Sequence, residues 1–168
     1  MFKDFKEQND KEREYFNQDF SVMNEVMKRI RSALLTGKTL DINDLNLNGI
    51  VEFIPSETLV YVTLFQAGQK FIRYGSKRAT FGQTIDRDIE MLRKNRRFND
   101  FNIEDFDKCR IMLEIAIDRK KISPKELNSQ NFDNGRFEIG INGLELRKDG
   151  ISYYYMPTDA ITLSHMGL

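Results

Sequence analysis

Apolar residues recur at helical spacing between Ser21 and Gly37, which predicts a helix packed on the core. Ser21 suits an N-cap, because its hydroxyl can accept a hydrogen bond from a backbone N–H of the first turn. Gly37 suits the end, since glycine readily adopts the left-handed conformation that terminates helices. The apolar positions are Val22, Val26, Ile30, Ala33 and Leu34.

A dense apolar run from Leu59 to Phe65 predicts a largely buried β-strand. The glycine-bearing turn Gln66–Gln69 reverses the chain, so that Lys70–Tyr74 is expected to return beside the first strand. A basic loop with two glycines, residues 72–82, then leads to a helix whose predicted N-cap is Thr84. This hairpin and loop form the stretch around which the remaining elements are expected to be organised.

Strict alternation of apolar and polar residues from Cys109 to Ile117 predicts a strand with one face on the core. Two dipeptides typical of type I′ turns, Asn142-Gly143 and Asp149-Gly150, follow further along the chain. They divide this region into a predicted antiparallel meander. Its three strands are Phe137–Ile141, Leu144–Lys148 and Ile151–Met156.

The remaining N-terminal segment, residues 1–20, mixes charged residues with spaced aromatic side chains and predicts a helical extension. Residues 21–168 combine helices with antiparallel hairpins, and are expected to form the main domain. We therefore predict an α+β fold, a two-lobed single domain in which an antiparallel-rich sheet is packed by helices.

Composition places the chain among soluble globular proteins. Of its 168 residues, 40% are hydrophobic and 31% are charged, and no apolar run approaches the roughly 18 residues that cross a bilayer. The first residues are too charged for a secretory signal. The single cysteine excludes an internal disulfide and fits a reducing compartment, so we expect a cytoplasmic protein.

Charge is distributed unevenly, although the net charge is zero. The segment 70–97 holds nine Lys and Arg residues against three acids, an excess that can attract phosphate-bearing partners. The plainer interpretation is that these side chains solvate one face of a helix and its flanking loops. Cys109 falls on an apolar strand face and is expected to be inert, and the lone His165 has no partner nearby in sequence. The pattern predicts no catalytic residue, metal site or cofactor.

Four places in the chain resemble one protein family. Val60–Leu64 is similar to a Val-Phe-Val-Thr-Leu strand, and Met156-Pro157 stands where the family has Leu-Pro. Arg97-Phe98, the turn Asn102–Phe106 and the strand Ile111–Ile115 follow in the family's order. Phe137–Gly140 with Asn142–Leu144 is similar to its Glu-Ile-Gly hairpin. Together they resemble the AMMECR domain family, whose microbial members are called AmmeMemoRadiSam protein A, over roughly residues 21–168.

The resemblance implies an α+β fold in two lobes, and a family role described both as enzymatic and as regulatory or scaffolding. The family hexapeptide Leu-Arg-Gly-Cys-Ile-Gly corresponds here to Ile72–Lys77, where only the aliphatic residue and Arg73 match. A thiol-dependent role is therefore not carried over. The family continues with a further helix and strand beyond residue 168. We expect either a shortened domain, or a sheet covered by the N-terminal helix or by a second copy in a homodimer.

Three functions are consistent with these features. The first is a non-catalytic binding or scaffold module for an anionic ligand or a protein partner, with its surface at loop 72–82. The second is an enzyme acting on a small phosphorylated or carboxylated substrate, which would need a base near Arg73. The third is nucleic-acid binding through segment 70–97, with Tyr74, Phe81 and Phe98 as stacking faces. The predicted ligand-binding residues are Arg73, Tyr74, Gly75, Lys77, Arg78 and Arg97.

Overall fold

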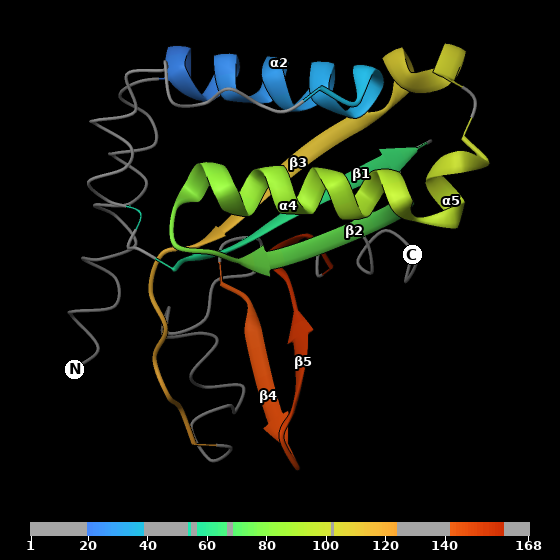
Figure 1. Cartoon of the computed structure of the whole chain (residues 1–168). Helices are drawn as coiled ribbons and strands as arrows, with labels where there is room; N and C mark the ends of the chain where they lie inside the picture. Colours follow the sequence, from blue (N-terminus) through green and yellow to red (C-terminus); the bar gives the residue numbers. More distant parts are fainter. Residues whose placement is uncertain are drawn as a thin grey trace, which may run out of the picture. The chain divides into compact units, whose positions relative to one another are not determined.

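The computed structural model describes residues 20–38, 54, 57–66, 69–101, 103–123 and 142–159. It contains helices and antiparallel sheets, which confirms the predicted α+β fold (Figure 1). The chain divides into two compact units, of which one is Asp19–Arg119 and the other includes residues 142–159. The predicted N-terminal helix before Phe20 and the strand Phe137–Ile141 lie outside the described residues. None of the described helices is long and apolar enough to cross a membrane.

Helix α2, Phe20–Thr36, confirms the first predicted helix. It ends at Gly37, whose φ of 73° lies in the left-handed region that glycine enters without a steric penalty. The backbone N–H of Gly37 donates to the carbonyl of Ala33 at 2.9 Å. The end of this helix is therefore fixed by one residue that the sequence pattern identifies.

Three antiparallel strands form the sheet of the Asp19–Arg119 unit, in the order β2-β1-β3. Strand β1 is Leu59–Gln66, β2 is Gln69–Lys77 and β3 is Arg110–Ala116. β1 pairs with both neighbours, and its register with β2 shifts between Leu64 and Phe65. Because β1 is central, its side chains are buried on both faces of the sheet.

The helix after the hairpin begins earlier than predicted. Helix α4 is Phe81–Lys94, and its N-cap is Thr80, whose hydroxyl accepts a hydrogen bond from the backbone N–H of Gln83 at 3.2 Å. The predicted cap, Thr84, is instead a buried residue of the first turn. Its hydroxyl donates to the carbonyl of Thr80 and accepts from the backbone N–H of Arg78. Helix α5, Arg96–Asn99, and the 3₁₀ helix η1, Ile103–Lys108, then lead to β3.

The core of this unit lies between one face of the sheet and the helices α2 and α4, which are on the same side of the sheet (Figure 1). Apolar side chains of alternating strand positions meet apolar stripes of both helices there, as the hydrophobic pattern predicts. The members that are at most 1% exposed are Val26, Ile30, Leu34, Val60, Val62, Leu64, Ile85 and Leu92.

The second unit contains an antiparallel hairpin of β4, Leu144–Lys148, and β5, Ile151–Tyr155. Its turn holds Asp149 and Gly150 with φ values of 52° and 77°, the pair of positive values that a type I′ turn requires. Both strands and their turn match the predicted meander. Leu146 and Tyr153 pair across the strands and are more than half exposed.

Candidate functional site

Four of the six predicted ligand-binding residues lie in a strand rather than in a loop. Strand β2 continues to Lys77, because residues up to that position pair with β1. Side chains alternate along a strand, so Arg73, Gly75 and Lys77 lie on one face of the sheet and Tyr74 on the other. The half-buried Tyr74 packs against the helix-covered core. The loop predicted for residues 72–82 is therefore much shorter, and spans only the residues between β2 and α4.

Arg73 is the centre of a buried polar cluster. Its Nη2 lies 3.2 Å from Oε2 of Glu114, and its Nε donates to Oγ1 of Thr63 at 2.9 Å. The two charged side chains are 13% and 7% exposed. Breaking such a pair leaves an uncompensated buried charge, a cost of about 3–5 kcal/mol. Arg73 thus has a structural partner, and the carboxylate that an enzyme would need near it is held in the same ion pair.

Gly75 faces the ring of Tyr61 across the two strands. A Cβ atom at position 75 would lie 2.1 Å from Cδ1 of Tyr61, a separation that carbon atoms cannot adopt. The predicted close approach of a ligand to this glycine is thus replaced by the close approach of an aromatic ring. We conclude that Gly75 makes room for Tyr61 in the packed sheet.

The other predicted residues are dispersed. Lys77 forms an ion pair with Glu57 at 3.0 Å, and Nη1 of Arg97 donates to the carbonyl of Phe71 at 3.4 Å. Arg97 belongs to α5, whereas Arg78 follows β2 and precedes α4. These six residues therefore do not form one concave site. Arg78 lines a surface hollow to which the other five do not contribute.

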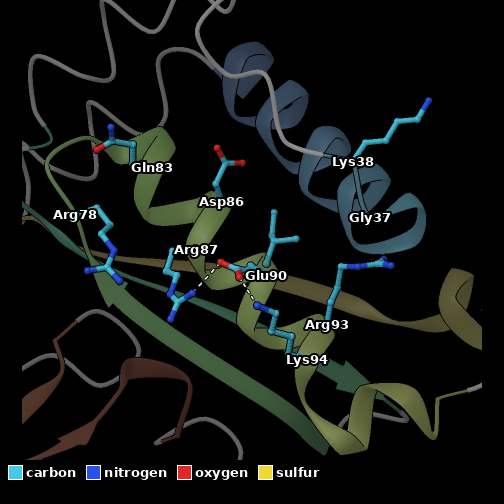
Figure 2. Close-up of a pocket in the computed structure, with 10 residues that line it drawn as sticks. Gly37, Lys38, Arg78, Gln83, Asp86, Arg87, Glu90, Arg93 and Lys94 are labelled. Carbon is cyan, nitrogen blue, oxygen red and sulfur yellow. Dashed lines mark hydrogen bonds and ion pairs between the residues drawn. The ribbon is translucent and has the colours of Figure 1, made fainter.

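That hollow runs along α4 beside the C-terminal end of α2, and we call it the α4 hollow (Figure 2). Its volume is about 700 Å³, which is within the usual range for small-ligand sites. Most of its lining comes from one helix, and Gly37 and Lys38 add the end of α2. The lining residues are Gly37, Lys38, Arg78, Gln83, Asp86, Arg87, Ile89, Glu90, Arg93 and Lys94.

Basic side chains dominate this lining. The five cations are Lys38, Arg78, Arg87, Arg93 and Lys94, and the two acids are Asp86 and Glu90. Glu90 receives hydrogen bonds from both Arg87, at 2.8 Å, and Lys94 (Figure 2), and these partners lower its pKa, Lys94 most strongly. One carboxylate is thus shared between two cations, and the excess of positive charge remains in the hollow.

Arg93 has a structural role at the edge of the α4 hollow. Its Nη1 donates to the carbonyl of Leu34, one of the last carbonyl groups of α2. Its guanidinium also lies against Gly37, so that a Cβ there would approach Nη2 to 2.8 Å. A cation in this place complements the negative end of the helix dipole. Arg93 therefore fixes the end of α2 beside α4 and so defines one wall of the hollow.

Asp88 is the most unusual charged residue of α4. Its side chain is fully buried, and neither carboxylate oxygen has a hydrogen-bond partner. Burial raises its pKa to about 7, although the Ser76 hydroxyl and the charges of Arg78 and Arg87 act in the opposite direction. The Ser76 hydroxyl donates instead to the carbonyl of Thr84, at 3.3 Å. Asp86, two positions earlier, lines the α4 hollow, so the two carboxylates face different surroundings, as their helical spacing predicts.

Most cations of the α4 hollow belong to the basic segment 70–97, for which the sequence left open both an anion-binding surface and simple solvation. Of these cations, Arg78 was a predicted ligand-binding residue. Spacing of Arg87, Glu90 and Lys94 by three and four residues places these side chains on one helix face, and this was the available signal. Lys38 lies 40 positions before Arg78, and no local pattern joins them. The sequence therefore predicted the basic residues of α4 but not the contribution of α2 to the lining of the hollow.

The aromatic residues proposed as stacking faces are used in packing. Phe81 is buried in the core, and Tyr74 and Phe98 pack against it. Phe71, Phe98, Phe101 and Phe106 form a cluster around Phe101, with ring centroids 5.4–6.4 Å apart. Cys109 is buried, and desolvation raises the pKa of its thiol, in keeping with its predicted place in the core. Within the described ranges no three His, Cys, Asp or Glu side chains are grouped to hold a metal.

Comparison of the chain with protein-family models, curated proteins and solved structures found no match. The resemblance to the AMMECR domain family therefore stays a prediction from the sequence.

Proposed function

We propose that this protein is a binding module for small ligands that carry phosphate or carboxylate groups, and that the α4 hollow is its ligand site. The observation that carries the proposal is the lining, in which five cations face two acids around about 700 Å³. Clustered cations in a concave surface concentrate field lines and attract anions. The proposal keeps the predicted anionic ligand and moves its site from the strand residues to α4.

Two cations of the lining support this function most directly. Among the described residues, neither the Lys38 ammonium nor the Arg78 guanidinium has a hydrogen-bond or ion-pair partner. Both side chains are exposed. Arginine offers a planar set of donors that matches phosphate and carboxylate oxygens, and lysine offers a mobile point charge. Arg78 and Lys38 can therefore contact a ligand without breaking an existing bond.

The first prediction concerns Arg78. Substitution Arg78→Gln removes a charge and keeps an exposed polar side chain, so the fold should be unaffected. We expect the affinity for inorganic pyrophosphate to fall by about tenfold, the effect of one charge-assisted hydrogen bond. Isothermal titration calorimetry of the full chain at low ionic strength measures this change.

A matched control is Arg110→Gln. Arg110 is exposed at the start of β3 and does not line the hollow. Its substitution alters net charge equally, and pyrophosphate affinity should stay within about twofold, since separated surface charges are screened. Equal weakening by both variants would show that binding follows overall charge, and would contradict the assignment of the site. Absence of pyrophosphate binding to the unmodified protein would contradict the function.

A further inference from the structure

Two neighbouring residues of α4 carry complementary polar atoms that are buried and unsatisfied. Nε of Arg87 is a donor without an acceptor, and both carboxylate oxygens of Asp88 are acceptors without a donor. Unpaired buried polar atoms are uncommon in folded proteins, because each one loses its hydrogen bonds to water without replacement. Adjacent residues of a helix do not face each other, so Nε of Arg87 can meet the Asp88 carboxylate only when the long Arg87 side chain turns inward.

Arg87 already has one carboxylate partner, which is Glu90. Its Nη1 donates to Oε2 of Glu90 at 2.8 Å, which holds the guanidinium at the α4 hollow (Figure 2). The Glu90 contact makes the largest contribution to the raised pKa of Arg87, and Tyr74 contributes further. Arg87 thus interacts with two carboxylates, by a hydrogen bond with Glu90 and through its charge with Asp88. One of them, Glu90, is half-exposed and shared with Lys94, and the other, Asp88, is buried.

The groups around Asp88 are few. From β2 the Ser76 hydroxyl acts on Asp88, and Arg78 follows that strand. The Tyr74 phenol, also from β2, acts on Arg87. From α4 itself come Arg87 and, through it, Glu90. The faces of β1 and α2 that pack against α4 consist of apolar core side chains. Arg78 and Arg87 are thus the two cations that act on Asp88, and both also line the α4 hollow.

We propose that Asp88 regulates anion binding at the α4 hollow: when its carboxyl group loses its proton, it attracts the guanidinium groups of Arg87 and Arg78 inward, and anion affinity falls. This inference rests on the proposed function, because it assigns a control to the same site. The step is a release of one proton to solvent, and no covalent bond is formed or broken.

Neutral pH is where this control operates. Desolvation is the main cause that raises the pKa of Asp88 to about 7, so the carboxyl is protonated at pH 5.5 and ionised at pH 8.5. In the protonated form Asp88 carries no charge that competes with a bound anion for Arg78 and Arg87. In the ionised form a buried negative charge competes with the anion for the same two cations. Affinity should therefore decrease as pH rises.

The test uses sulfate, whose charge does not change between pH 5.5 and 8.5. We expect the dissociation constant of sulfate for the full chain to rise by about tenfold across this interval, within the range usual for coupled sites. Asp88→Asn should bind sulfate with a constant that changes much less across the same interval. NMR titration of the backbone amides of residues 78–94 measures the sulfate affinity of both proteins and shows where sulfate binds.

Asp86→Asn is the matched control. Asp86 lines the α4 hollow on the same helix, so removal of its charge should strengthen sulfate binding at every pH without altering the pH dependence. Other titrating groups act on all variants alike, and the difference between Asp88→Asn and the unmodified chain isolates Asp88. Equal pH dependence in Asp88→Asn and the unmodified chain would overturn the inference.

A direct measurement covers the case in which Asp88→Asn does not fold. The carboxyl ¹³C resonance of Asp88 in the unmodified protein should titrate near pH 7, and added sulfate should raise that pKa, because coupling between two sites is reciprocal. A carboxyl that titrates near pH 4, or that ignores sulfate, would contradict the inference. If sulfate binds and Arg78→Gln weakens it, the proposed function stands even when the pH dependence is absent. If sulfate and pyrophosphate both fail to bind, the function itself is wrong.

Discussion

Tyr61 occupies the space that any side chain at position 75 would need. The two residues are paired across β1 and β2, and a Cβ at position 75 would lie within 2.3 Å of two ring carbons of Tyr61. The ring is largely buried, and the guanidinium carbon of Arg73 lies 6.0 Å from its centroid. Because the ring is packed on its other sides, it cannot move away at little cost.

The second prediction is that Gly75→Ala lowers the free energy of unfolding by about 2 kcal/mol, as overpacking of a close contact does. In a Tyr61→Ala background the same substitution should cost much less, because the ring is absent. Urea denaturation of the four proteins gives the coupling energy between the two positions. Additive effects would show that the cost arises from the backbone at Gly75 rather than from the ring.

Arg73 shows what alternation along a strand can and cannot predict. The period of two places it correctly on the face opposite the helix-covered core, where the plainer interpretation expected solvent. The structure buries the part of that face next to Arg73, with Thr63 fully buried and Glu114 only 8% exposed. An alternation assigns a side chain to a face, but the covering of that face depends on residues distant in the sequence. The partner Glu114, 41 positions away, therefore could not be predicted.

The N-terminus of α4 depends on Thr80. Its extended backbone and its hydroxyl bond to the Gln83 amide are typical of an N-cap. The third prediction is that Thr80→Ala lowers the free energy of unfolding by about 1 kcal/mol, while Thr80→Asp has little effect because aspartate caps equally well. Thermal denaturation of both variants measures this. Equal loss in Thr80→Ala and Thr80→Asp would contradict the role of the cap.

Helices and strands with a regular pattern were largely predictable. The C-terminal end of α2 and the alternation of β3 match the structure closely, since each depends on residues in or next to the element itself. The predicted N-cap of α2 is wrong, because Ser21 lies inside a helix that already includes Phe20. The bounds of β2 did not match, because its last three residues are extended only by pairing with β1. The start of α4 was displaced by four positions for a similar reason. Thr84 is also a plausible cap in sequence, but in the fold it is buried and its hydroxyl accepts a hydrogen bond from the backbone N–H of Arg78.

Stability of the folded chain should depend on pH through Asp88. Its pKa is about 7 in the folded state and about 3.8 when exposed. Between these two pKa values the folded state binds more protons than the unfolded state, so the free energy of unfolding decreases as pH rises. Above both pKa values it no longer changes with pH. The full difference corresponds to about 4 kcal/mol at pH 8.

The fourth prediction follows from this decrease in stability with rising pH. Relative to the unmodified chain, Asp88→Asn should become progressively more stable as pH rises from 4 to 8, by up to about 4 kcal/mol. Glu145, whose pKa is lowered to about 2 chiefly by Arg147, contributes equally to both proteins, so its effect cancels in the difference. Chemical denaturation at several pH values checks this. A difference that is independent of pH would contradict an ionisable buried Asp88.

The distribution of charge shows how much of the candidate site could be predicted from the sequence. The net charge is zero, and the basic excess of segment 70–97 was evident from the sequence. Its three-dimensional distribution was not, because pairing in the sheet occupies Arg73 and Lys77 with acids that lie elsewhere in the chain. Those cations that remain available gather along α4, and only the folded arrangement adds Lys38 from α2.

The fit between Gly75 and Tyr61 also bears on how this chain can diverge over generations. A change at position 75 is tolerated only after position 61 has lost its ring, whereas a smaller residue at 61 opens position 75 to side chains. Substitutions at the two positions should therefore be correlated, and the change at position 61 should come first. In distantly related sequences we therefore expect these two paired positions of neighbouring strands to hold a large residue and a glycine together, or to have both changed, even where the surrounding residues no longer align.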